Sequence, residues 1–83
     1  MAFYSRLKSL FDSLDEKGYN VSLTYDIDFG NAHVKIWLTP QQLDEFKMMD
    51  DLLTRQGLYS VLLSSETKTG AVLYSIQAKG ASL

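Results

Sequence analysis

The sequence predicts an α+β fold in which a helix–strand–strand unit occurs twice, forming a four-stranded, mainly antiparallel sheet with two helices packed on one face. Helical spacing of apolar residues, strict alternation in two later stretches, and a match between the halves after a shift of 39 residues all point to it. One unit cannot cover its own apolar face. We therefore expect units at about 3–39 and 40–79 to close over a common core as a single domain, with 80–83 as a flexible tail.

The first element is a helix from Phe3 to Lys17. Gly18 follows it and supplies a left-handed stop, and Lys17 suits the carboxyl end of a helix. Apolar residues fall three or four positions apart on one face: Phe3, Leu7, Leu10, Phe11 and Leu14.

A β-hairpin follows. Apolar and polar residues alternate from Asn20 to Phe29 and from Ala32 to Thr39, and Gly30-Asn31 is typical of a two-residue turn. This turn predicts the apolar pairs Phe29–Ala32, Ile27–Val34, Tyr25–Ile36 and Leu23–Leu38. On the opposite face it predicts Asp28–His33, Asp26–Lys35 and Thr24–Trp37.

The second unit repeats this order. Thr39, Pro40 and Gln42 predict a capped helix start, and the helix is expected to run to about Gln56, before Gly57. Strands are predicted near 58–66 and 71–79. Their core side would hold Val61, Leu63, Val72, Tyr74, Ile76 and Ala78, and Leu62 and Leu73 would face outward. Strand orders 2-1-3-4 and 1-2-4-3 both keep all neighbours antiparallel.

The composition disfavours or excludes several classes of function. The 83 residues carry a formal net charge of −2, which disfavours a non-specific nucleic-acid binder. The absence of cysteine excludes disulfides and thiolate chemistry and fits a cytoplasmic protein. Arg6, Lys8 and Asp12 interrupt the apolar residues of the N-terminus, so we expect neither a signal peptide nor a membrane association.

Catalytic and metal chemistry find little support in the sequence. His33 is the single histidine, and Asp28 opposite it is better interpreted as a surface pair than as a catalytic dyad. Asp26, Asp28 and His33 alone do not complete a metal shell. The chain has no phosphate-binding loop and no nucleophile elbow. We expect no enzyme activity, no metal and no cofactor, and the chain is short for a ligand cavity of several hundred Å³.

The residue pattern predicts a binding surface on one face of the sheet. Alternation places Trp37 opposite the helices, and an aromatic anchor with apolar neighbours and a polar rim is typical of a recognition surface. The candidate residues are Trp37, Leu62, Leu73, His33, Lys35 and Thr24. The partner would be another protein or a second copy of the chain.

This pattern favours a small interaction module, such as an inhibitor or adaptor. Phages and mobile elements produce many compact, cysteine-free, acidic chains of this kind. This expectation comes from how frequent such proteins are, and no particular residue indicates it. The alternative is single-stranded nucleic-acid binding on the same face, with Trp37 stacking on a base and Lys35, His33 and Lys79 near phosphates. The carboxylates of Asp26 and Asp28 would repel the phosphate backbone of such a ligand.

Overall fold

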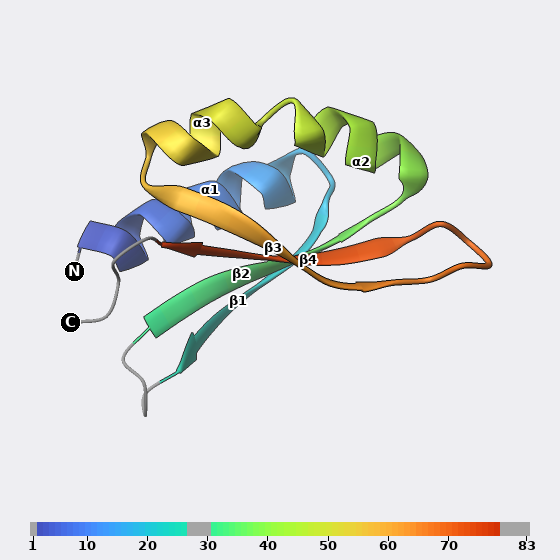
Figure 1. Ribbon diagram of the computed structural model, residues 1–83. Coiled ribbons are helices and arrows are strands. Elements are labelled where there is room, and N and C mark those ends of the chain that lie inside the picture. The colour runs from blue at the N-terminus through green and yellow to red at the C-terminus, as the bar shows by residue number, and fades with distance from the viewer. Residues whose placement is uncertain (1, 27–30, 79–83) are drawn as a thin grey trace.

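The computed structural model of the chain describes residues 2–26 and 31–78 (Figure 1). The predicted tail, 80–83, lies outside them. The elements in chain order are α1 (Ala2–Glu16), β1 (Asn20–Asp26), β2 (Asn31–Leu38), α2 (Pro40–Lys47), α3 (Asp50–Arg55), β3 (Leu58–Ser65) and β4 (Val72–Ala78).

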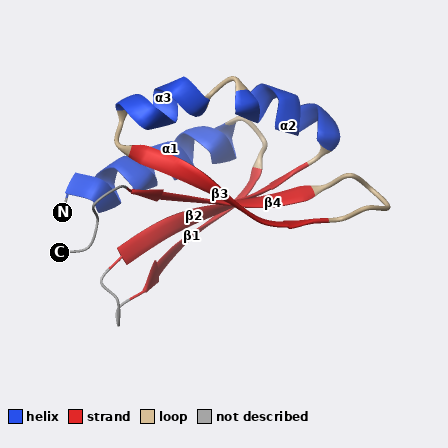
Figure 2. Cartoon of the chain, in the orientation of Figure 1, coloured by secondary structure: helices blue, strands red, loops and turns tan. Residues whose placement is uncertain are grey.

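The four strands form one antiparallel sheet in the order β1-β2-β4-β3, which is one of the two orders that the sequence left open (Figure 2). All three helices lie on the same side of this sheet, with α1 packed mainly on β1 and β2 and α3 on β3 (Figure 1). The predicted α+β class and the antiparallel sheet are therefore confirmed. The sheet order makes β1 and β3 the two edges and joins the two hairpins through β2 and β4.

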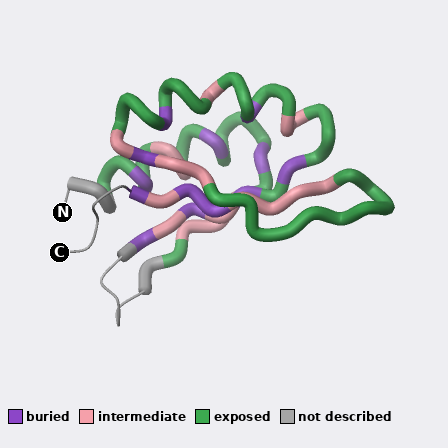
Figure 3. Tube along the Cα trace, in the orientation of Figure 1, coloured by how far each residue is buried: buried purple, intermediate pink, exposed green. Residues whose placement is uncertain are grey.

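The core lies between the helices and the sheet (Figure 3). The strands β1, β2 and β4 contribute alternate residues to it, because successive side chains of a strand point to opposite faces, and β3 contributes Leu58. The side chains with less than 2 % exposure come from α1, α3, β2, β3 and β4: Leu7, Leu14, Val34, Ile36, Leu38, Leu53, Leu58 and Ile76.

The predicted second helix is two helices, so the prediction of one continuous helix to Gln56 is wrong. Met48 N–H donates to the Glu45 carbonyl at 3.2 Å, and Met49 N–H donates to the Phe46 carbonyl at 3.0 Å. These bonds span three residues instead of the four of an α-helix, so the chain tightens for one turn between α2 and α3. Met49 still packs against the core, while Met48 is exposed.

The start of α2 matches its prediction. The Gln42 backbone N–H donates to Thr39 Oγ1 at 3.2 Å, and the Thr39 backbone N–H donates to Gln42 Oε1 at 3.1 Å. Pro40 occupies the first turn, where its missing N–H removes no intrahelical bond. The reciprocal pair satisfies two backbone donors that the helix itself leaves without partners.

The first hairpin has a different register from the predicted one. Val21 pairs with Ile36 and Leu23 with Val34, a shift of four residues from the register of a turn at 30 and 31. Asn31 belongs to β2 and pairs with Asp26, so the two-residue turn is wrong, and its Gly30 lies outside the described residues. The observed register sets Val21 and Leu23 beside fully buried residues of β2, so core packing outweighs the turn preference.

The faces of two residues in β3, Val61 and Leu62, also differ from the prediction. Leu62 pairs with Tyr74, whose ring contacts Phe46 of α2 at a centroid distance of 5.3 Å, so Leu62 belongs to the helix side. Val61 lies on the opposite side, and the register shifts between Leu62 and Ser64. Three consecutive apolar residues, 61–63, have no alternation of their own. The buried Leu58 and the β-bulge set their faces instead.

Candidate functional site

The sheet face opposite the helices, here called the open face, carries three rows of side chains that run across all four strands. The strand registers place one residue of each strand in each row. From β1 to β3, the rows are Asn20, Trp37, Leu73 and Ser64; Ser22, Lys35, Ser75 and Val61; and Thr24, His33, Gln77 and Tyr59.

Trp37 is the large apolar side chain near one end of the open face. Its neighbours along β2, Ile36 and Leu38, are buried under the helices, and Trp37 itself keeps 39 % of its surface exposed. The residues directly opposite it are Asn20 on β1 and Leu73 on β4. An indole held beside a half-buried leucine in a regular sheet loses little conformational freedom on binding.

Hydrogen bonds order the polar side chains at the other end of the face. Tyr59 Oη donates to Gln77 Oε1 at 3.0 Å, and Gln77 Nε2 donates to Ser75 Oγ at 3.2 Å. Ser75 is only 2 % exposed although no helix covers this face, because longer side chains, including Lys35 and Val61 directly opposite, surround it. The chain of bonds from β3 to β4 fixes these groups before any partner arrives.

The three rows of the open face carry few charges. Lys35 is the one lysine or arginine among their twelve residues, and none of the twelve is acidic. Two residues beyond Thr24, β1 ends at Asp26, whose place in the strand alternation is on the same face. The helical layer instead carries many exposed charges, which are carboxylates at Asp12, Asp15, Glu16, Asp44, Glu45, Asp50 and Asp51 and basic groups at Arg6, Lys8, Lys47 and Arg55. The open face is thus the less charged of the two layers and is partly aromatic.

Five of the six predicted site residues lie on the open face: Trp37, Leu73, His33, Lys35 and Thr24. Leu62 does not, since it is on the helix side. Tyr59 and Val61 belong to the face and were missed by the sequence analysis. Counting alternate residues from the buried Leu58 places both of them correctly, but the burial of Leu58 is a property of the tertiary structure.

The polar pairs expected across the first hairpin do not form. His33 lies opposite Thr24 and Gln77, and Lys35 lies opposite Ser22 and Ser75. The proposed partner of His33, Asp28, is outside the described residues. Within 2–26 and 31–78, no three acidic or histidine side chains gather in a way that could hold a metal ion.

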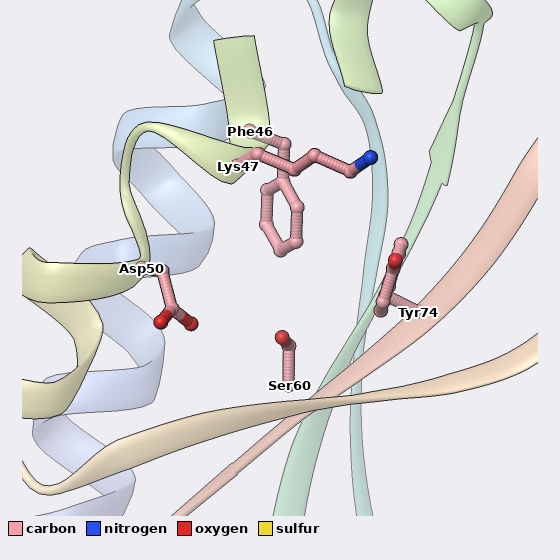
Figure 4. A pocket seen from close by; sticks show the side chains of 5 residues that line it. All are labelled: Phe46, Lys47, Asp50, Ser60 and Tyr74. Atoms are coloured by element: carbon pink, nitrogen blue, oxygen red, sulfur yellow. The ribbon is translucent and has the colours of Figure 1, made fainter. Parts of the chain in front are cut away.

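A small open pocket of about 270 Å³ lies on the helix side between the α2–α3 turn and the sheet (Figure 4). Phe46 and Tyr74 form its apolar part, and polar groups come from Lys47, Asp50 and Ser60. From the length of the chain, no cavity of this size was predicted. The pocket exists because the helical layer is divided above β3, where Ser60 offers a short side chain.

None of the helices in the described part of the chain is long and apolar enough to cross a membrane. Comparisons with models of protein families, with curated proteins and with solved structures find no match to this chain.

Proposed function

We propose that the chain is a non-enzymatic protein-interaction module that binds a partner protein on its open face, with Trp37 as the main anchor. The observation that carries the proposal is the exposure of Trp37 beside Leu73 on an uncovered sheet. Interface hot spots are enriched in Trp and Tyr and lie next to groups that exclude water from them. The action of such a module is that of an inhibitor or adaptor, through occupation of a partner surface.

Two further features support a protein partner. The bonds between Tyr59, Gln77 and Ser75 leave the polar end of the face ordered, which lowers the entropy lost on binding. The three rows also combine the apolar Trp37, Leu73 and Val61 with polar side chains, a mixture of apolar and polar groups that is common in protein interfaces.

The test compares the wild type with Trp37→Ala and with the control Gln41→Ala. Gln41 is also exposed, but it lies on α2 in the helical layer. Each protein is used to capture partners from extracts of the cell that produces it, and the captured protein is then purified and titrated. We expect Trp37→Ala to raise the Kd by about fivefold or more, with Gln41→Ala near wild type. Equal affinity of all three proteins for the partner would place its site elsewhere.

Single-stranded nucleic acid is the second candidate, favoured by Tyr59, which is a second aromatic residue on the open face beside Trp37. Trp37 and Tyr59 are four residues apart along the strands and two strands apart, a separation of roughly 16 Å, so they would stack on different bases. Binding to a mixed oligonucleotide pool that weakens from low to moderate salt, and weakens again in Trp37→Ala, would select this function over the first.

A further inference from the structure

The edge strand β3 carries an uncharged apolar segment that no other described strand covers. Within residues 2–26 and 31–78, β3 pairs with β4 alone, and its outer side is an edge of the sheet. The strand reads Leu-Tyr-Ser-Val-Leu-Leu-Ser-Ser, without a charge or a proline. Val61, Leu62 and Leu63 are exposed by 37 %, 54 % and 47 %, and Figure 3 shows this half of the strand as exposed.

Natural sheets protect such edges with charged residues, proline, bulges or very short strands. β3 has only a bulge, between Leu62 and Ser64, and the stretch before it keeps the regular alternation. The other edge differs, since β1 has no exposed large apolar side chain at residues 20–24. An open edge with this composition is a template for pairing with another strand.

The helical layer above β3 also has two exposed apolar side chains, beside the charged Asp51 and Arg55 of α3. Met48 is 83 % exposed in the turn before α3, and Leu52 is 53 % exposed on α3. The helix α3 packs on β3, and Asp50 lines the same pocket as Ser60 of β3. Of the exposed large apolar side chains in the described residues, only Trp37 lies outside the segment 48–63.

We propose that β3 pairs antiparallel with β3 of a second copy of this chain, so that two sheets join into one of eight strands. The composition of the strand selects this occupant. In an antiparallel pair related by a two-fold axis the strand faces itself, and a strand without charge brings no like charges together. A two-fold axis perpendicular to the sheet keeps both helical layers on one side, where Met48 and Leu52 add apolar area next to the joined edges.

The joined sheet has a consequence for the open face. Val61 and Tyr59 of both copies would meet at the centre of one continuous face, flanked by the two Trp37 side chains. Two copies would therefore offer a surface twice as wide to a large partner. This dimer does not depend on what the open face binds.

The test measures the mass in solution over a concentration series by sedimentation, using wild type, Leu62→Lys and the control Thr24→Lys. Thr24 is an exposed residue of the opposite edge strand. We expect a wild-type dimer, a dissociation constant raised by about tenfold or more in Leu62→Lys, and no change in Thr24→Lys. A wild type that stays monomeric throughout, or a dimer indifferent to Leu62→Lys, overturns the proposal.

A second measurement decides the question even if Leu62→Lys fails to fold. The chain has no cysteine, so single-cysteine variants cross-link only through the introduced thiol. Under mild oxidation, at least one of Val61→Cys, Leu62→Cys and Leu63→Cys should give a disulfide dimer, because facing strand residues come close enough to bridge. Trp37→Cys and Thr24→Cys should not. Cross-linking through Trp37→Cys, with none through β3, would assign self-association to the open face instead.

Discussion

Tyr19 Oη donates a 2.7 Å hydrogen bond to Glu45 Oε2, which joins the connection between α1 and β1 to the second helix, α2. The Tyr19 ring is buried, whereas Glu45 is exposed. The hydrogen bond to Glu45, followed by burial and by the negative charge of that carboxylate, raises the pKa of Tyr19 above its ordinary value of 10.0. The bond is therefore a tertiary link between segments 26 residues apart.

Replacing Tyr19 with Phe should lower the free energy of unfolding by about 1 kcal/mol at neutral pH, because the hydrogen bond to Glu45 is lost and the ring is kept. Urea denaturation measures the change. Asp44→Asn is the control, since it removes a neighbouring exposed charge without touching the bond. A loss that is the same in Asp44→Asn would mean that the charge of α2, and not the bond, is responsible.

The same bond predicts a pH dependence. In the unfolded chain Tyr19 releases its proton near pH 10, whereas the folded protein holds it to higher pH. The contribution of Tyr19 to stability is thus complete below about pH 10 and is lost as the pH rises from there through the raised pKa. The stability difference between wild type and Tyr19→Phe should be constant below about pH 10 and should shrink as the pH rises above it. A difference that stays constant above about pH 10 as well would contradict the assignment.

Gly70 ends the β3–β4 hairpin loop at φ +74°, and a Cβ there would lie 3.0 Å from Pro40 Cγ at the start of α2. Gly18 has a similar φ of +89° with open space around it, so it is a matched control. Gly18→Ala should cost about 1 kcal/mol from backbone strain alone. Gly70→Ala should lower the free energy of unfolding by more than Gly18→Ala does, because the new methyl group also meets Pro40 Cγ.

The double variant Gly70→Ala with Pro40→Ala separates strain from crowding, because it removes the atom that the new methyl group meets. Thermal unfolding of the four proteins in the cycle should show that part of the Gly70→Ala loss disappears in the Pro40→Ala background. Additive losses would mean that the loop relaxes away from Pro40.

Ser75 should be sensitive to charge although it lies on the open face. Ser75→Ala removes the acceptor for Gln77 Nε2 and should lower the free energy of unfolding by about 1 kcal/mol. Ser75→Asp should lower it by about 2 kcal/mol, because the desolvation of a carboxylate at this buried position exceeds what pairing with Lys35 on the facing strand returns. Ser64→Asp, at an exposed position of the same face, should stay within about 0.5 kcal/mol of wild type. Chemical denaturation compares the three. Equal effects at Ser75 and Ser64 would show that the face is less ordered than its hydrogen bonds indicate.

Local patterns in the sequence determined the kinds of element and several of their ends. The spacing that buries Leu7 and Leu14 defines α1, the Thr39–Gln42 box starts α2, and alternation in β2 sends Trp37 away from the buried Ile36. These features depend on neighbours a few residues away, so the chain carries them in its own order. The α+β class follows from them.

Only the tertiary structure decided how the strands meet. A shift of four residues leaves every side chain of the first hairpin on its face, so alternation cannot distinguish the Val21–Ile36 pair from Tyr25–Ile36. Packing between segments far apart in the chain likewise decided three other features. These are the position of β2 beside β4, the face of Leu62, and the break between α2 and α3. Alternation along each strand decides which side chains lie on the same face, so most residues of the open face could be predicted from the sequence. Which strands pair, and therefore how these residues form rows and why β3 is an edge, depends on contacts between segments far apart in the chain.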